Sequence, residues 1–530
     1  MKLNIYEEAS RCLLCEDAPC TRACATGDPA RAVRAIRFDN GKFAGKWVAE
    51  CTDEDLETAE RACIHYDRPI RIREMVAPLR LPRGGETTAS TASPRGGLEG
   101  ASLSITFCGI PCENPFFLAS SAVCTNYEMV ARAFNAGWAG VFYKTICMQE
   151  IKEVSPRFDA CQQEGRADFY AFRNMEQLSE NPVEMDFDIL RRLKQNYPTK
   201  VVVASIMGQT EEQWIELARM AEEAGCDAVE LNFSCPQMRL AGMGSDVGQN
   251  PELVLFYTAY VKRSVSIPVI PKMTPNITQI NQPAMASYFA GADAISAINT
   301  IKSVTMGDRA EVSGRKAVSG LSGRAVKPIA LRYILEMAQN PVLNGAHGKK
   351  VELSGIGGIE TWRDALEFIQ LGCRNVQVCT AVMQYGYRII DDLILGLQNY
   401  LAERGLSSLD ALVGEELPNI VTPTDLDRDT IVFPKIDREQ CIGCGRCYVS
   451  CMDGGHQAIA FDTKESLPSS GEVGRGLRQP RIVGTKCVGC HLCRLVCPTG
   501  AIGVTKRIKK KAHRPERPPH PPVEAPDGAG

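Results

Sequence analysis

Short apolar runs alternate with longer amphipathic stretches through residues 104–417, which is most of this 530-residue chain. Apolar runs bounded by turn residues are typical of buried strands, and the stretches between them have the apolar spacing of helices. Eight strands alternating with helices close into a (β/α)8 barrel, so the pattern predicts an α/β fold built on a TIM barrel. The predicted strands are 116–119, 140–144, 201–206, 228–231, 269–273, 294–298, 351–354 and 375–379, and predicted helices include 127–136, 210–223, 251–264, 282–290, 328–339 and 361–371.

An open, doubly wound sheet would give a similar alternation. Such a sheet should carry the dinucleotide fingerprint GxGxxG directly after a strand. The sequence does not contain that fingerprint, which favours the barrel.

The chain contains 23 cysteines, a content that would indicate disulfides in a small secreted protein. This chain is large, and its opening MKLNIYEEASRC lacks the apolar core of a secretory signal. We therefore expect reduced cysteines and a cytoplasmic location. We expect neither membrane nor nucleic-acid binding, because no apolar stretch reaches the roughly 20 residues of a membrane span and the net charge is only −3.

The strongest motif is a repeated cysteine array, CxxCxxCxxxC, near the carboxyl end. In two-cluster bacterial ferredoxins, three cysteines of one such run and the last cysteine of the other hold each 4Fe-4S cluster. Zinc usually needs a single pair of CxxC units and fits this repeat poorly. The predicted ligand sets are Cys441, Cys444, Cys447 and Cys497 for one cluster, and Cys487, Cys490, Cys493 and Cys451 for the other.

A weaker array, CxxCxxxxCxxxC, lies near the amino end. It could hold one further 4Fe-4S cluster, with Cys51 or Cys63 able to replace one of its members. A zinc or purely structural role also stays open. The array consists of Cys12, Cys15, Cys20 and Cys24.

These patterns divide the chain into segments. Residues 82–103 are rich in Gly, Ser, Thr and Pro and cannot build a core. The basic, Pro-rich end is typical of disorder. The predicted division is a helical iron-sulfur domain at 1–81, a flexible linker at 82–103, the barrel at 104–417, a connector at 418–434, an α+β ferredoxin-like domain with two clusters at 435–505 and a disordered tail at 506–530.

Polar residues gather where the predicted strands end, which is where barrel enzymes place their chemistry. The motif ELNFSCP puts Asn232, Ser234 and Cys235 directly after the fourth strand. A free cysteine is most often a small buried residue, so the interest of Cys235 lies in its position.

The last two strands are followed by a candidate phosphate site. Barrels commonly bind phosphate there, through loop amides and a helix amino terminus. The Gly357–Gly358 pair follows the seventh strand, and Cys379 with Thr380 follows the eighth.

Further polar residues are predicted at the same end of the barrel. A lysine in such a place needs an anion, and a flavin that is negative at N1 when reduced would supply one. Amides on loops can hold both edges of a planar ring of alternating C=O and N–H groups. The lysines are Lys144 and Lys272, and the loop residues are Asn174, Glu176, Asn299 and Thr300.

Together the barrel motifs closely resemble those of dihydropyrimidine dehydrogenases, in particular the bacterial pyrimidine-reducing subunit. The motifs are FYKT, FRNMEQ, ELNFSCP, KMTPN, AINT, SGLSGRAVKPIALR and SGIGGI. The resemblance covers residues 104–505. It implies FMN in the barrel, two 4Fe-4S clusters behind it, and uracil or thymine as the substrate.

The resemblance also implies roles for individual residues. Cys235 would be the catalytic cysteine, exchanging a proton at C5 of the pyrimidine while FMN exchanges hydride at C6. FMN would be bound by Ser120, Lys144, Lys272, Asn299, Thr300, Gly357, Gly358, Cys379 and Thr380, and the pyrimidine by Asn174, Glu176, Asn232, Ser234, Asn299 and Thr300.

Two departures from the family bear on electron supply. The second close cysteine group of the amino-terminal domain is missing, with only Cys51 and Cys63 in its place. The FAD and NADPH domains of the large single-chain members are also missing, and only residues 82–102 stand in that position. We therefore expect a hetero-oligomer in which a flavoprotein that oxidises NAD(P)H, or a ferredoxin, supplies electrons.

Two other functions stay open. Dihydroorotate dehydrogenases share this kind of barrel and an NxSCP loop, but usually have Asn after the Pro, where this chain has Gln237. Glu176 would also repel the carboxylate of orotate. The second alternative is a non-catalytic electron-transfer subunit with a degenerate barrel.

Overall fold

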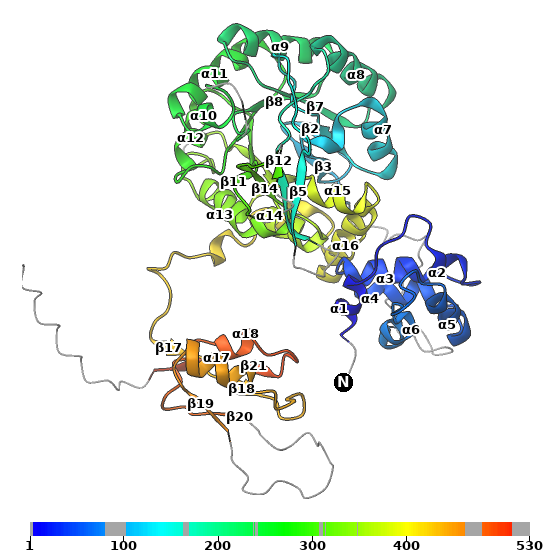
Figure 1. The fold of residues 1–530 in the computed structure, drawn as a ribbon. Helices are drawn as coiled ribbons and strands as arrows, with labels where there is room; N and C mark the ends of the chain where they lie inside the picture. The colour runs from blue at the N-terminus through cyan, green and yellow to red at the C-terminus, as the bar shows by residue number, and fades with distance from the viewer. Residues whose placement is uncertain are drawn as a thin grey trace, which may run out of the picture. The chain divides into compact units, whose positions relative to one another are not determined.

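The computed structural model describes residues 4–79, 102–162, 169–236, 238, 242–306, 311–312, 314–346, 348–461 and 480–510. They belong to two compact units, residues 1–419 and 420–530 (Figure 1). The first unit contains the amino-terminal helices and the barrel, and the second contains the cysteine repeat. The predicted linker falls almost entirely outside the described residues, and the predicted domain bounds stay predictions.

Eight parallel strands close into a barrel in the first unit, so the predicted fold is confirmed. Every predicted strand is present, and the order around the barrel follows the order along the chain. The strands are β3 (Phe116–Leu118), β4 (Gly140–Phe142), β7 (Val201–Ile206), β8 (Ala228–Asn232), β9 (Val269–Lys272), β10 (Ala294–Ala297), β15 (Glu352–Ile356) and β16 (Cys373–Val378).

Helices cover the outside of the barrel, as Figure 1 shows. Several begin at residues that cap a helix well: Asn126, Thr210 and Thr361 each accept a backbone N–H of the first turn. In the part of the chain that the structure describes, no helix is long and apolar enough to cross a membrane. The outer helices are α7 (Tyr127–Ala136), α8 (Val183–Asn196), α9 (Glu211–Glu223), α11 (Pro251–Ser264), α12 (Asn281–Phe289), α13 (Lys327–Ala338), α14 (Trp362–Gln370) and α16 (Ile389–Arg404).

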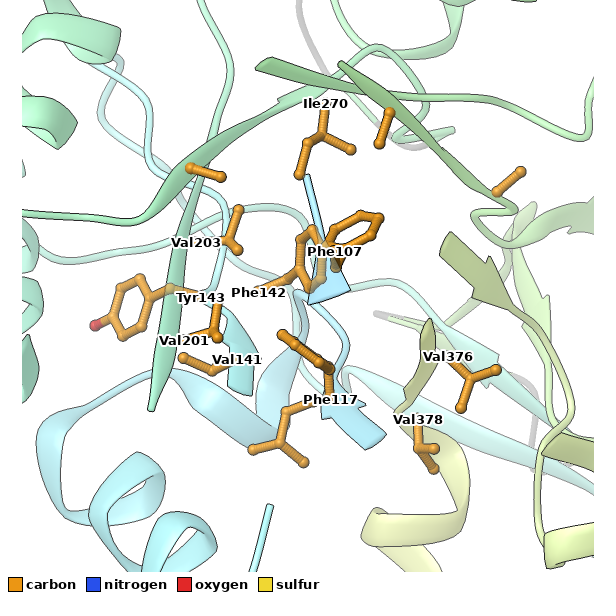
Figure 2. Close-up of a cluster of buried hydrophobic side chains, with 14 of the residues drawn as sticks. Phe107, Phe117, Val141, Phe142, Tyr143, Val201, Val203, Ile270, Val376 and Val378 are labelled. Atoms are coloured by element: carbon orange, nitrogen blue, oxygen red, sulfur yellow. The ribbon is translucent and has the colours of Figure 1, made fainter. Parts of the chain in front are cut away.

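A short hairpin, β1 (Ile105–Phe107) with β2 (Ile110–Cys112), lies at the amino-terminal end of the barrel. Arg374 Nε donates to Thr106 O at 3.2 Å, and the Cys108 N–H donates to Glu352 Oε2 at 2.6 Å, which ties the hairpin to the beginnings of β16 and β15. Phe107 is fully buried among side chains of the barrel strands (Figure 2). This hairpin was not predicted, because strands of three residues are too short to show periodicity.

A four-stranded antiparallel sheet stands at the opposite, carboxyl-terminal end of the barrel. Its strands are β5 (Phe158–Gln162), β6 (Phe169–Asn174), β14 (Ser319–Ser322) and β11 (Ile301–Ser303). The buried Arg173 holds it together by donating to Ser319 Oγ at 2.8 Å and to Asp159 Oδ2 at 2.9 Å. The prediction that Asn174 lies on a loop was therefore wrong, because Asn174 is the last residue of β6 and pairs with Phe158.

The amino-terminal helices enclose a small core of their own. They also bind the barrel, since Asn40 Nδ2 donates to Asp392 O at 3.0 Å and Arg34 Nε lies 2.9 Å from Asp392 Oδ2. Phe38 packs edge-on against Tyr385, with ring centroids 5.1 Å apart. These helices are α1 (Ile5–Ser10), α2 (Pro19–Arg22), α3 (Pro29–Arg37), α4 (Gly41–Ala44), α5 (Asp53–Arg61) and α6 (Ile72–Val76).

The second unit repeats one small pattern of strands and a helix. Its helices are α17 (Arg446–Gly454) and α18 (Leu492–Leu495). Strands β18 (Pro434–Ile436) and β21 (Ile502–Val504) pair, as do β19 (Ile459–Phe461) and β20 (Pro480–Ile482). A further pair joins β17 (Thr430–Ile431) to β22 (Ile508–Lys509), so the predicted disorder is wrong for the first residues after 505.

Candidate functional site

A cavity opens at the carboxyl-terminal end of the barrel and encloses about 1050 Å³ of space, its open mouth included. It is lined by every residue predicted to touch a flavin or a pyrimidine except Ser234. The structure thus brings these residues together, and their individual roles stay predictions. They are Ser120, Lys144, Asn174, Glu176, Asn232, Cys235, Lys272, Asn299, Thr300, Gly357, Gly358, Cys379 and Thr380.

Both lysines of the cavity are buried, and both face carboxylates. Lys144 Nζ lies 2.6 Å from Glu176 Oε2, and Lys272 Nζ lies 3.5 Å from Glu230 Oε1. Arg157 adds a second cation to Glu176, with Nη1 3.1 Å from Oε1. Lys144 was predicted to touch the flavin and Glu176 to touch the pyrimidine, and the two form an ion pair.

Ser234 joins the two central amides of the cavity from behind. Its Oγ donates to Asn232 Oδ1 at 2.7 Å and accepts from Asn299 Nδ2 at 2.9 Å. Asn232 Nδ2 also donates to Thr145 Oγ1 at 2.8 Å, and Asn299 Oδ1 accepts the Thr300 N–H at 2.7 Å. These bonds fix both amide orientations, and each amide retains a second N–H for a ligand.

Cys235 follows β8 and is 6% exposed. Its carbonyl accepts the Ser245 N–H at 2.9 Å, and Gly244 lies close behind it with a φ of +58°. Burial raises the pKa of the other cavity thiol, Cys379, so that thiol stays protonated. Gln237, the residue that bears on the orotate alternative, lies outside the described residues.

Sequence reasoning missed the wall that the antiparallel sheet contributes. Phe158, Phe172 and Ser322 line the cavity from this sheet, and Ser322 Oγ lies 2.9 Å from Thr380 Oγ1. The available signals were two motifs of the resemblance, SGLSGRAVKPIALR, which contains Ser322, and FRNMEQ, which contains Phe172, but neither assigned a role to these two residues.

The carboxyl-terminal cysteines divide between two small cavities. Cys441, Cys444, Cys447 and Cys497 line one, and Cys451, Cys487, Cys490 and Cys493 line the other. This is the grouping predicted from the spacing. Within the described ranges, no three His, Cys, Asp or Glu side chains are gathered as a preformed metal site, so the ligand roles stay predictions.

The amino-terminal cysteines group in the way that the alternative with Cys63 describes, and their roles as ligands stay predictions. Cys12, Cys15 and Cys20 line one cavity together with Cys63, whereas Cys24 does not line it. Burial, followed by the neighbouring Cys12, Cys63 and Cys15, raises the pKa of the Cys20 thiol to about 11. Cys24 is buried elsewhere, with its Sγ 3.4 Å from the Sγ of Cys51.

Comparison with known proteins gives the family. Residues 102–401 match the family model described as dihydroorotate dehydrogenase, and residues 434–504 match that of the 4Fe-4S dicluster domain. The chain belongs to the dihydroorotate dehydrogenase family. It is an oxidoreductase, and within this family it is similar to dihydropyrimidine dehydrogenases, as the motifs predicted.

Three relatives illustrate the range of this family. The NAD-dependent dihydropyrimidine dehydrogenase subunit PreA of Escherichia coli (strain K12) is 50% identical over 418 residues, which cover 78% of this chain and 97% of the relative. The chloroplastic dihydropyrimidine dehydrogenase (NADP(+)) of Arabidopsis thaliana is 37% identical over 338 residues, 61% of this chain and 79% of the relative. The catalytic subunit of dihydroorotate dehydrogenase B (NAD(+)) from Pyrococcus abyssi is 35% identical over 318 residues, 59% and 98% of the two chains.

Membership of the dihydroorotate dehydrogenase family implies a flavin, and the cavity fits one. Lysines and amides provide cations and donors for an anionic, planar ring. Gln377 Oε1, a buried acceptor in the cavity wall, has no hydrogen-bond partner among the described residues. Gly358 has a φ of +75°, and a Cβ there would lie 2.8 Å from Gly323 O, so the path of this loop requires glycine.

Proposed function

We propose that this chain catalyses the reversible reduction of uracil or thymine to the 5,6-dihydropyrimidine. The observation that carries the proposal is one cavity in which Cys235 stands with Asn174, Asn232 and Asn299 and with two buried lysines. The relative named dihydropyrimidine dehydrogenase subunit PreA, at 50% identity, supports the same class of substrate.

The residues of the cavity have separate tasks in this reaction. Lys144, Lys272, Gly357 and Gly358 would hold FMN, with Ser120, Cys379 and Thr380 beside them. When bound, FMN supplies the chemistry of hydride transfer at C6 of the pyrimidine. The chain's own residues bind the pyrimidine, orient it and move its proton.

The amides orient the pyrimidine, and Cys235 exchanges the proton at C5 of the ring. The retained N–H groups of Asn232 and Asn299 are donors for the ring carbonyls, and Ser234 keeps both donors aimed because it fixes both amides. Cys235 gives a proton to C5 in the reductive direction and takes it back in the other. A thiol that is nearly buried delivers its proton to the substrate in preference to water.

Electrons reach the barrel through iron-sulfur clusters from a partner subunit. A flavoprotein that oxidises NAD(P)H, or a ferredoxin, would supply them in a hetero-oligomer, and the relative at 50% identity is itself named a subunit. Two clusters would be held by the predicted sets of the second unit. A third would be held by Cys12, Cys15, Cys20 and Cys63, since these four line one cavity.

Dihydroorotate oxidation is a second candidate, and one observation favours it. Glu176 was expected to repel an orotate carboxylate. Lys144 and Arg157 both lie beside Glu176 and offset its charge, so this repulsion is weakened. The relative named dihydroorotate dehydrogenase B (NAD(+)), catalytic subunit, at 35% identity, also supports this candidate.

Anaerobic mixing of the purified protein with dihydrouracil tests the proposal. Dihydrouracil should bleach the flavin absorbance faster than dihydroorotate does. A C235A variant should keep its flavin and lose at least about 100-fold in the bleaching rate, because it lacks the group that takes the proton. Faster bleaching by dihydroorotate would replace the proposal with the second candidate, and absence of bleaching by either compound would refute both.

A further inference from the structure

Glu230 is a fully buried carboxylate in the interior of the barrel, and the proposed reaction does not use it. It lies on β8 two residues before Asn232, so both side chains point to the same face of the strand, into the barrel. Asn232 lines the cavity, whereas Glu230 does not. Glu230 therefore lies one layer deeper than the residues that contact ligands.

The contacts of Glu230 are those of a charged group. Ser205 Oγ donates to Oε1 at 2.9 Å, and Ser296 Oγ donates to Oε2 at 2.8 Å. Lys272 Nζ lies 3.5 Å from Oε1. A buried carboxylate is stable only when it is paired and hydrogen-bonded, and these three neighbours, from three different strands, meet both conditions.

Lys272 connects this deeper layer to the cavity. Its ammonium is 3% exposed, lines the cavity and reaches Glu230 at the outer limit of a hydrogen bond. An ammonium has three N–H donors, so one can face Glu230 while the others face the cavity. The charge of Lys272 is thus shared between a fixed carboxylate and whatever anion occupies the cavity.

We infer that Glu230 is a positioning residue that fixes Lys272 and sets how strongly the cavity stabilises negative charge on a bound flavin. This inference rests on the flavin site proposed above. Glu230 withdraws part of the charge of Lys272 from the cavity and adds a negative charge beneath it. Both effects oppose reduction to an anionic flavin, so Glu230 keeps the flavin a better electron donor to the pyrimidine.

Hydroxyl groups also link Glu230 to the cavity wall. Ser205 Oγ lies 2.9 Å from Thr145 Oγ1, which lies 3.0 Å from Ser120 Oγ. Removing Ser205 would break this chain without changing any charge. A Ser205→Ala variant therefore separates an effect of local packing from an effect of the carboxylate charge.

The test is the equilibrium between oxidised and reduced flavin against a redox dye, measured anaerobically on the flavin-loaded full chain. E230Q keeps the shape of the side chain and removes its charge, so the ratio of reduced to oxidised flavin should rise by about tenfold or more, as expected for a unit charge lost from a poorly solvated site. D186N is the matched control. Asp186 is also fully buried and accepts from Tyr143 and Asn181, but it lies outside the cavity and outside the hydroxyl chain.

The outcomes separate this inference from the function on which it rests. D186N should leave the ratio within about twofold of the unsubstituted protein, and S205A, which removes one donor to Glu230 but keeps its carboxyl group, should shift the ratio less than E230Q does. An unchanged ratio in E230Q, or a shift in S205A as large as that in E230Q, would overturn the inference while leaving the flavin site intact. If E230Q fails to hold flavin, the same measurement is made on E230D, which keeps the charge but draws it away from Lys272. E230D should then give a smaller shift in the same direction, and no shift would overturn the inference. A wild-type protein without flavin would instead refute the proposed function.

Discussion

Replacing Gly244 with alanine should misplace Cys235 without touching any side chain of the cavity. Gly244 has a φ of +58° and precedes the short helix α10 (Ser245–Gly248). A Cβ at this position would lie 2.4 Å from Cys235 O and 3.0 Å from Met238 Cγ. The first of these contacts is with backbone, so the segment that carries Cys235 has to move.

The size of the movement follows from the contact. The Cys235 carbonyl must recede by at least about 0.6 Å to reach even the tightest tolerated separation, and by about 1 Å for an ordinary one. A misplacement of about 1 Å in a reacting group can lower the rate by about 100-fold. We therefore expect G244A to reduce dihydrouracil-dependent flavin bleaching by between about tenfold and 100-fold.

Gly242 provides the matched control. It also has a positive φ, +75°, but a Cβ there would meet no atom of the described residues within 4 Å. Both substitutions carry the backbone strain of a left-handed residue, about 1 to 2 kcal/mol, and only G244A adds the collision with Cys235.

The assay is the single-turnover bleaching rate, with flavin content and thermal midpoint measured on each variant. G242A should bleach at close to the wild-type rate, with a lower midpoint. G244A should keep its flavin and lose rate. Equal rates in the two variants would refute the claim that the backbone position of Cys235 limits proton transfer.

Two further predictions concern the amino-terminal helices. C63S should lower the iron content of anaerobically prepared protein by about four atoms per chain, the content of one cluster, whereas C24S should leave it unchanged, and the reverse result would restore the ligand set inferred from spacing alone. Asp392, which faces Arg34 of the amino-terminal helices, has its pKa raised to about 6, first by burial, so the folded state binds its proton more tightly than the unfolded state does. The stability that this proton contributes is complete below the ordinary Asp range and is lost as the pH rises through 6. The free energy of unfolding of the wild type relative to D392N should therefore fall by about 1 to 1.5 kcal/mol between pH 5 and pH 7.5, and a constant difference would contradict this.

The barrel could be predicted from the sequence because its strands are buried on both faces and therefore form continuous apolar runs. Their carboxyl ends must meet at one edge of a closed barrel, which is why residues as distant in sequence as Lys144 and Thr380 could be assigned to one site. Periodicity could not reveal the sheet that covers this end of the barrel. Its two halves pair over a long sequence separation, as Asn174 does with Gly320, and nothing local specifies such partners.

The amino-terminal cysteines show a different limit. Spacing favoured Cys24 because it is near Cys20 in sequence, yet Cys24, which comes just after α2, does not line the cavity, whereas Cys63, which comes after α5, does. Sequence proximity predicts neighbours well only inside one regular element. In the second unit the grouping from spacing and the grouping in the cavities agree, because there Cys451 lies within α17 and Cys497 follows α18, and each lines the cavity of the other run.

The two lysines of the barrel cavity share one arrangement, and it gives the site its chemical bias. Each lysine is buried and each is paired with a buried carboxylate, Lys144 with Glu176 and Lys272 with Glu230. A cation left unpaired in such a site would hold an anionic, reduced cofactor tightly, and hydride transfer to an uncharged pyrimidine would then be uphill. Pairing with a carboxylate weakens the attraction of each lysine for an anionic cofactor, and the closer the lysine nitrogen lies to the carboxylate oxygen, the weaker that attraction becomes. The longer separation, 3.5 Å at Glu230 against 2.6 Å at Glu176, leaves Lys272 the stronger anion-binding group of the two. Loss of a carboxylate should therefore favour the reduced cofactor and loss of a lysine the oxidised one, and these opposite signs are what distinguish an effect of charge from an effect of packing.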